Sequence, residues 1–286
     1  MNQDLLVSIV IPVFNGSNYL SKAIESALIQ DYSSLEIIVI NDGSNDNSKT
    51  RDIALSFGEK IRYFEKENGG VASALNFGIS KMQGDYFSWL SHDDLYVPNK
   101  ISSQVNFLKQ YDTLSKKNIV FSDYELIDFN EKVFGRSYLA IQNISSFRIW
   151  LTGQSLLNGC TLLIPRAAFD GDVKFNEDLK HTQDYDFWFR IAEKFDFVYF
   201  HQHLVKSRQH PEQDSIKLAG EAWKEVKQMK LFFVKSLGKN DFKLIHGDFS
   251  LIQFFVDLVN QGFYLVAFLF VLKYLKYRSL KSLFLP

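Results

Sequence analysis

Cysteine is nearly absent from this 286-residue chain, whose only cysteine is Cys160. A single thiol excludes a disulfide within the chain and a metal site built from several thiolates. We interpret Cys160 as a small buried residue at the start of a strand, since the turn-forming pair Asn158-Gly159 precedes it and the run 161–163 continues as a strand.

An excess of charge of either sign is also lacking, because 32 Lys and Arg residues balance 33 Asp and Glu residues, for a net charge of -1. This balance removes any global electrostatic reason to expect a nucleic-acid partner. The 46% hydrophobic and 23% charged residues are typical of a globular protein and exclude disorder of the whole chain. Residues 1–4 do not begin a secretory signal, so we expect a cytoplasmic protein in which the glycosylation-like motifs at Asn15 and Asn143 are chance matches.

Glycine-rich phosphate-binding motifs are missing as well. After the first apolar run the chain reads Asn15-Gly16-Ser17-Asn18, which is not the G-x-G-x-x-G of dinucleotide sites, and no G-x-x-x-x-G-K-[ST] occurs. A diphosphate bound here would need another positive group, and a divalent cation such as Mn²⁺ or Mg²⁺ is the usual substitute.

The first third of the chain contains a regular alternation of short apolar runs with helical spacing. The pattern predicts strands over 7–14, 35–40, 61–64 and 86–90, and helices over 19–29, 48–56 and 71–81. Strands joined by such short helical crossovers form a parallel sheet with both faces covered. We therefore predict an α/β fold with a mostly parallel central sheet and flanking helices.

The alternation loosens after residue 118. Strands are predicted over 119–123, 161–164 and 197–200, a helix over 184–194, and an apolar-rich helical region from 217 to the end. No segment is long and polar enough to require an independent second domain.

Acidic residues follow two of the predicted strands. Asp42 closes the second strand, where it could accept hydrogen bonds from a ribose or base, although Asn-Asp-Gly-Ser is also good turn sequence. Asp93 and Asp94 follow the fourth strand and offer hard oxygen ligands for a cation; the alternative is that they cap the helix after Pro98.

Five segments, in this order, resemble family 2 glycosyltransferases with the GT-A fold. They are Val7–Asn15 with Val39–Ser44, Asn68–Gly70 with Ala74–Ile79, Trp89–Asp94 in the place of a D-x-D motif, Gln183–Arg190, and Arg208–His210 with Gln213 and Ser215. Each segment alone is a weak signal, whereas five in the family's order are specific.

The resemblance implies roles for individual residues. Asp184 would be the general base, and the metal ligands would be Asp93 and His210, with Asp94 as a further candidate. The donor would be bound by residues of all the early segments and the late one: Pro12, Phe14, Asn15, Asp42, Asn68, Gly69, Gly70, His92, Asp93, Arg208 and His210. The chain departs from the family at Ser91, which replaces the first acid of D-x-D, and at Leu75, where arginine is frequent.

The same resemblance implies an inverting, hexosyl-type transfer from a UDP-linked (or dTDP- or GDP-linked) sugar to an acceptor hydroxyl. The acceptor would be a glycan or be lipid-linked or protein-linked, in bacterial polysaccharide or glycoconjugate assembly. Residues 1–215 would form the catalytic domain, with the nucleotide-sugar half over about 1–95 and the acceptor half over about 96–215, followed by a helical region over 216–286.

Several alternatives stay open at the level of sequence. Asp186 could replace Asp184 as the base, and His201 with His203 could form a metal pair, although a solvent-facing or hydrogen-bonded pair is the simpler interpretation. The chain could also be a catalytically silent binding subunit of this fold, or a sugar nucleotidyltransferase, although the latter needs a basic, glycine-rich early loop that is missing.

The C-terminal region offers a second hypothesis. The ten apolar residues Phe263 to Leu272 are too few to span a bilayer, and Lys273, Lys276, Arg278 and Lys281 follow them. This pattern suits a helix lying at the inner face of the plasma membrane, against anionic lipids. The alternative is a helix pair that packs on the catalytic domain or across a homodimer.

Overall fold

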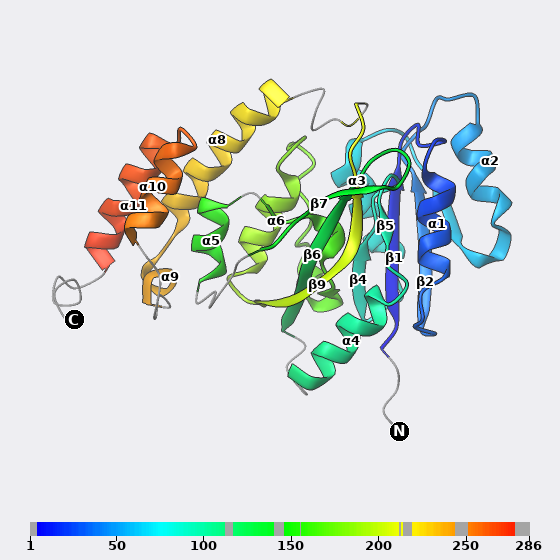
Figure 1. Cartoon of the computed structure of the whole chain (residues 1–286), viewed down its shortest axis with the longest axis horizontal. Coiled ribbons are helices and arrows are strands. Elements are labelled where there is room, and N and C mark those ends of the chain that lie inside the picture. Colours follow the sequence, from blue (N-terminus) through cyan, green and yellow to red (C-terminus); the bar gives the residue numbers. More distant parts are fainter. Residues whose placement is uncertain are drawn as a thin grey trace.

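The computed structural model describes residues 5–111, 117–139, 146–154, 156–211, 213, 219–243 and 251–277. Some predicted features lie outside these residues: the N-terminal residues 1–4, the motif at Asn143, and Ser215, Arg278 and Lys281. Within them the predicted α/β architecture is confirmed. A layered sheet region occupies one side of the molecule and a helical region the other (Figure 1).

A five-stranded sheet forms the core of the first half, with strand order β3-β2-β1-β4-β8. The first four strands are parallel and β8 is antiparallel to β4. The elements of this half are β1 (Val7–Val13), α1 (Leu20–Leu28), β2 (Leu35–Asn41), α2 (Lys49–Ser56), β3 (Arg62–Glu65), α3 (Gly70–Lys81), β4 (Tyr86–Trp89) and β8 (Ile164–Pro165), with a 3₁₀ turn at Gly58–Lys60.

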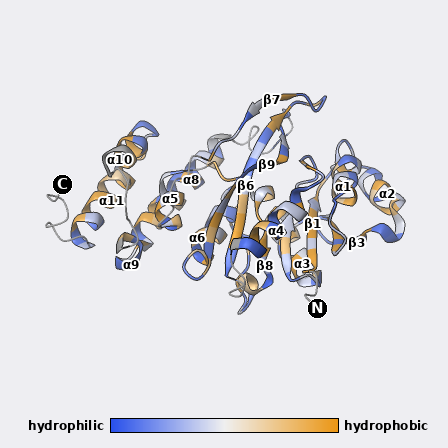
Figure 2. Cartoon of the chain, turned by 60° about the horizontal axis from the view of Figure 1, so that its bottom comes forward, coloured by the Kyte–Doolittle hydropathy of each residue, from blue (hydrophilic) through white to orange (hydrophobic). Residues whose placement is uncertain are grey.

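Both faces of this sheet are buried, which explains why β1 is apolar at nearly every position. Ile9 and Ile11 belong to the hydrophobic cluster that includes α1, whereas Val10 belongs to the cluster that includes α3. Figure 2 shows hydrophobic residues along much of the β1 ribbon. Because parallel strands all end at one edge, the loops that follow β1, β2, β3 and β4 lie together there.

A second sheet of four strands, ordered β5-β9-β6-β7, continues the fold. Its elements are β5 (Leu95–Tyr96), β6 (Asn118–Ile127), β7 (Val133–Arg136) and β9 (Asp196–Arg208), and α4 (Lys100–Tyr111) precedes β6. The strands β6 and β9 are parallel and both are longer than predicted, so β9 runs from the predicted segment at 197–200 to the late motif at Arg208.

The predicted strand over 161–164 is largely wrong. Residues Gly159–Thr161 form a 3₁₀ turn, and only Ile164–Pro165 pair as a strand. The turn forms because the side-chain oxygen of Asn158 accepts a hydrogen bond from the backbone N–H of Cys160 at 2.8 Å. Such a local cap competes with extended structure. Cys160 is buried as expected, but in this turn rather than at a strand start.

The C-terminal helices share a hydrophobic cluster with the sheet region. The remaining elements are α5 (Phe147–Gly153), a 3₁₀ turn at Arg166–Phe169, α6 (Gln183–Ile191), α8 (Ala219–Ser236), α9 (Lys239–Lys243), α10 (Leu251–Asn260) and α11 (Tyr264–Tyr277). Phe189 of α6 stacks on Phe233 of α8 with ring centroids 4.0 Å apart. No helix among the described residues is both long enough and apolar enough to cross a bilayer.

Candidate active site

Asp42 ties two of the loops at the carboxyl edge of the sheet together. Its buried carboxylate accepts hydrogen bonds from the backbone N–H of Gly70 at 2.7 Å and of Gly69 at 3.1 Å, and from the Lys66 ammonium at 2.7 Å. Asn68 adds a bond from its side-chain amide to the Asp42 carbonyl at 2.9 Å. The predicted donor residues Asp42, Asn68, Gly69 and Gly70 therefore lie together, at the start of α3.

The loop after β1 is joined to the same region. Asn15, in the left-handed conformation, exchanges two 2.8 Å hydrogen bonds with Asn45, and its backbone N–H donates to the Ser44 hydroxyl. Pro12 is buried in β1, whereas the neighbouring Phe14 exposes 44% of its surface. An exposed aromatic ring beside a rigid polar loop could stack on a flat heterocycle.

Gly43 lies where the loop after β2 closely approaches the backbone of Asn68. Its φ is +71°, and a Cβ added there would lie 2.6 Å from the backbone nitrogen of Asn68. Only glycine fits, for both conformational and steric reasons.

We expect Gly43→Ala to destabilise the chain by more than the matched change Gly58→Ala. Both residues have positive φ, which costs an alanine about 1–2 kcal/mol. An added Cβ at Gly58 meets nothing within 4 Å, whereas at Gly43 it meets backbone, which should cost about 1–3 kcal/mol more. Urea unfolding of both variants measures the difference. Equal free energies of unfolding would show that the loop after β2 can move away from Asn68.

Asp93 and His210 face each other beside the donor loops. The Nε2 atom of His210 lies 3.1 Å from Oδ2 of Asp93, and the side-chain amide of Gln213 donates to the same oxygen at 3.2 Å. Burial would raise the pKa of Asp93, but the neighbouring His92 and the bonds from Gln213 and His210 hold that pKa below its usual value. The His92 ring packs against Gly16, where an added Cβ would come within 2.5 Å of it.

Asp94 has a different environment from its neighbour. Its buried carboxylate accepts a hydrogen bond from the backbone N–H of Arg208 at 2.9 Å. Burial, and then the charge of Asp93, raise the pKa of Asp94 to about 7. This hydrogen bond fixes the end of β9 against the loop after β4. The Asp94 carboxylate is directed at the Arg208 backbone, whereas Asp93 is the acid that faces His210.

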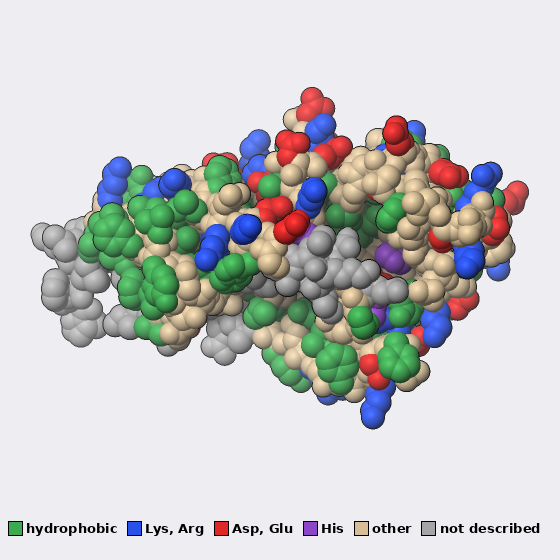
Figure 3. Space-filling model, turned by 90° about the horizontal axis from the view of Figure 1, so that it is seen from above, with side chains coloured by type: hydrophobic (Ala, Val, Ile, Leu, Met, Phe, Trp, Pro, Cys, Tyr) green, Lys and Arg blue, Asp and Glu red, His purple; other side chains and the backbone are tan. Residues whose placement is uncertain are grey.

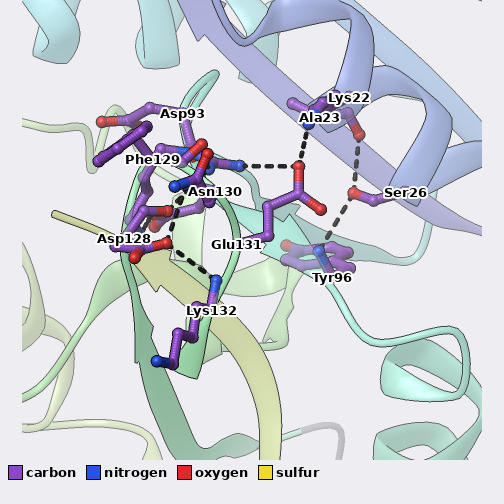
Figure 4. Close-up of polar contacts among 12 residues, drawn as sticks. Lys22, Ala23, Ser26, Asp93, Tyr96, Asp128, Phe129, Asn130, Glu131 and Lys132 are labelled. Atoms are coloured by element: carbon purple, nitrogen blue, oxygen red, sulfur yellow. Dashed lines mark hydrogen bonds and ion pairs between the residues drawn. The ribbon is translucent and has the colours of Figure 1, made fainter. Parts of the chain in front are cut away.

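The Arg208 side chain is fully buried and clamps the same loop. Its Nε donates to the Asp93 carbonyl at 2.9 Å, and Nη1 donates to the Asp128 carbonyl at 3.1 Å. The guanidinium also lies 4.6 Å from the Tyr19 ring, which in turn contacts His210. Figure 4 shows the 128–132 loop, whose Glu131 reaches Lys22 of α1. Its contacts make Arg208 a support for Asp93 and His210.

A cavity of about 310 Å³ lies between the loop after β4 and the start of α6. Asp93, Asp94 and Asp184 all line it. The rest of the wall comes from Trp89, Ser91, Tyr124, Leu126, Leu157, Asn158, Gly159, Cys160, Ser207, Gln209 and Gln213. Among the described residues no histidine lines this cavity; on the face of the molecule seen in Figure 3, histidine side chains lie in a hollow beside it.

Asp184 is the second residue of α6 and is half-buried in the cavity wall. Burial, with a smaller contribution from the charge of Glu225, raises the pKa of Asp184 to about 7, which suits a group that must take up a proton at neutral pH. The alternative base, Asp186, forms an ion pair with Arg190 at 2.8 Å and lines a different pocket.

The other candidates take structural positions. His203 lies 3.0 Å from the Ser137 carbonyl and contacts Tyr138, while His201 packs on Tyr199, which agrees with the simpler interpretation of this pair. Leu75, which stands where arginine is frequent in the family, is buried in the core. Sequence reasoning missed the contributions of Tyr19, Tyr124, Asn158 and Glu225, because none of them belongs to a motif.

Asp93 and His210 fit a divalent cation as two of its ligands. Adjacent ligands of an octahedral ion at 2.0–2.1 Å lie about 3 Å apart, close to the 3.1 Å between Oδ2 and Nε2. No group of three or more His, Cys, Asp or Glu side chains among the described residues could hold a metal by itself. Oxygens from substrate phosphates and water would have to complete the coordination.

Comparisons with solved structures agree with the observed fold. TarS 1–349 from Staphylococcus aureus, in complex with UDP-GlcNAc, aligns with a TM-score of 0.64 at 16% identity, covering 92% of this chain and 73% of that one. A mannosyltransferase from Pyrobaculum calidifontis, in complex with GDP-Man and Mn²⁺, aligns with a TM-score of 0.55 at 15% identity, covering 99% and 78%.

Sequence comparisons find relatives of higher identity than the solved structures. An uncharacterized glycosyltransferase of Rickettsia typhi is 47% identical over 259 residues, covering 88% of this chain and 78% of that protein. Another, from Rickettsia felis, is 51% identical over 219 residues, but the aligned part spans only 36% of its length. The family model described as glycosyl transferase family 2 matches residues 8–159, more than half of this chain. The protein therefore belongs to glycosyltransferase family 2.

Proposed function

We propose that this glycosyltransferase transfers a sugar from a UDP-linked donor to an acceptor hydroxyl with inversion, with Asp184 as the general base. The observation that carries the proposal is the cavity that Asp93 and Asp184 share. One acid faces an imidazole suited to hold a metal–diphosphate, and the other, on a different element, has a pKa near neutrality. The donor and the acceptor hydroxyl would meet between them.

The chemistry requires one base and no covalent intermediate. A hydroxyl group becomes a better nucleophile when a carboxylate takes its proton during attack, which contributes roughly 10²–10⁴ in rate. Asp184 would accept that proton while the acceptor oxygen forms a bond to the anomeric carbon and the bond to the diphosphate oxygen breaks. A single displacement of this kind inverts the anomeric configuration.

The leaving nucleoside diphosphate would be held by Asp93, His210 and the donor loops. A bound Mn²⁺ or Mg²⁺ would act there as a Lewis acid that stabilises the charge on the diphosphate. The rigid 14–16 and 42–43 loops, with the exposed Phe14, would receive the nucleoside. A UDP donor is supported by TarS, which is similar in fold and was solved with UDP-GlcNAc.

The direct test measures product release from a panel of nucleotide-sugars with Mn²⁺. We expect one donor, UDP-linked, to yield free nucleoside diphosphate, faster when the acceptor is present. Formation of nucleoside triphosphate from sugar nucleotide and pyrophosphate would instead indicate a nucleotidyltransferase. No turnover of any donor, combined with measurable donor binding, would indicate a silent binding subunit.

We further propose that α11 contacts anionic lipid at the inner face of the bacterial membrane, where a lipid-linked acceptor would be found. Four exposed apolar residues, Leu265, Phe268, Leu272 and Leu275, recur at helical spacing on one face of this helix. Lys276 is exposed beside them, and the sequence continues with Arg278 and Lys281. An apolar stripe with adjoining basic residues suits an interfacial helix.

We expect the full chain to float with anionic liposomes and Leu272→Glu to reduce that flotation several-fold. The matched control is Leu55→Glu on α2, because Leu55 and Leu272 expose similar fractions of their surfaces, 50% and 48%. A concentration-dependent dimer that Leu272→Glu disrupts, without flotation of the unmodified chain, would assign the stripe to a homodimer interface instead.

A further inference from the structure

We propose that Glu225 of α8 is a positioning residue for the base, holding the start of α6 so that Asp184 faces the cavity. The proposal rests on the function proposed for Asp184 and makes α8, outside the matched family segment, part of the catalytic apparatus.

The carboxylate of Glu225 occupies the N-terminal end of α6. Its oxygens accept hydrogen bonds from the backbone N–H groups of Thr182 at 2.7 Å, His181 at 2.9 Å and Lys180 at 3.2 Å. The Thr182 hydroxyl donates to the same carboxylate at 2.7 Å instead of capping its own helix. Successive backbone N–H groups that point at one spot form an anion-binding site, and here three of them, directly before the first residue of α6, bind a side chain from another helix.

This contact lies directly beside the base. Thr182 is the N-cap of α6 and Asp184 follows two residues later. The other side of the same turn is fixed by Tyr185, whose hydroxyl accepts a hydrogen bond from the backbone N–H of Leu157 at 2.8 Å. Leu157 also lines the cavity, so α6 is held between the cavity wall and α8.

Glu225 also contributes charge. Burial is the main cause of the raised pKa of Asp184, and the negative charge of Glu225 raises that pKa further. The other titratable groups that line the cavity are Asp93 and Asp94 from the loop after β4, Tyr124 from β6 and Cys160 from the 159–161 turn. Tyr185 of α6 itself adjoins Asp184. None of these hydrogen-bonds the 180–182 backbone in the described structure, as Glu225 does.

Two conservative variants separate the effect of side-chain length at position 225 from the effect of its charge. Glu225→Gln keeps the length and one acceptor oxygen but loses the charge, whereas Glu225→Asp keeps the charge but is one methylene too short. We expect both to lower kcat about tenfold with little change in the donor KM, because the Glu225 carboxylate binds the start of α6 and not the donor loops. Only Glu225→Gln should shift the acid limb of the pH–rate profile to lower pH.

The control is Glu221→Gln, an exposed acid one turn earlier on α8, which should leave kcat and the pH profile unchanged. Thermal melts run in parallel, because a purely structural role would lower the melting temperature without moving the acid limb. A folded Glu225→Gln protein with unchanged kcat and acid limb would overturn the proposal. Asp184→Asn is measured alongside. An active Asp184→Asn variant would contradict the proposed function. An inactive Asp184→Asn variant together with fully active Glu225 variants would contradict only the inference about Glu225.

Discussion

Replacing Asp184 by Asn is expected to lower sugar transfer at least about 100-fold while the protein stays folded and binds its donor. Asn has the same size and shape as Asp but cannot take a proton, so the loss should equal the general-base contribution, whose low end is about 10². Isothermal titration with the donor and steady-state transfer rates separate binding from chemistry. The loss should appear in kcat, because Asp184 stands on α6, a different element from the donor loops.

Asp186→Asn is the matched control for this experiment. Asp186 lies two residues away on the same helix, but its carboxylate pairs with Arg190 and lines a different pocket. We expect this change to lower stability slightly and to leave kcat within a few-fold. An inactive Asp186→Asn variant together with an active Asp184→Asn variant would show that Asp186, and not Asp184, is the base.

The pH dependence follows from the direction of the shift. Because burial raises the pKa of Asp184 to about 7, the carboxylate is mostly protonated, and inactive as a base, below that pH. Transfer should therefore rise with pH through about 7 and level off above it. A rate that is flat between pH 5 and 8 would contradict an Asp184 base with this pKa.

Replacing Asp93 by Ala is expected to abolish detectable transfer and to weaken donor binding in the presence of Mn²⁺. Asp93 supplies the carboxylate that faces His210, so the variant loses one of two proposed protein ligands and the protein's link to the diphosphate. Without added metal, the unmodified chain and the variant should bind the donor equally weakly. Full turnover of the unmodified chain in excess EDTA would contradict the metal requirement.

Asp94→Asn distinguishes the two neighbouring acids. Its amide oxygen can still accept the hydrogen bond from the Arg208 backbone, and the change removes a carboxyl group that burial already disfavours as an anion. We expect the Mn²⁺ concentration for half-maximal activity to stay close to that of the unmodified chain. A large increase in that concentration would mean that Asp94, rather than His210, accompanies Asp93 at the metal.

The sequence predicted the sheet region well because local pattern and tertiary environment agree there. Strand β1 is apolar at nearly every position since both its faces are buried, and α1 shows helical spacing because one face packs on that sheet. The prediction failed where a single side chain decides the backbone, as at Asn158, whose cap turns the chain before β8.

The residues of the candidate site that belong to motifs could be predicted from the sequence. The residues that hold them in place could not. Asp93, His210 and Asp184 stand in segments that resemble a family, so the order of residues along the chain was enough to propose their roles. The partners that hold them are separated in sequence: the Arg208 side chain binds the Asp93 carbonyl, 115 residues away, and Glu225 binds Thr182, beside Asp184 and 43 residues away. Contacts over such distances depend on how helices and strands pack, which no local pattern encodes.

The anomeric configuration of the first product tests the central claim most directly. The full chain would be given its donor, identified from the panel, together with an acceptor hydroxyl, and the new glycosidic linkage would be assigned by NMR before any equilibration. A single displacement assisted by Asp184 predicts the configuration opposite to that of the donor. Retention of the donor's configuration would require a second displacement and would contradict the account.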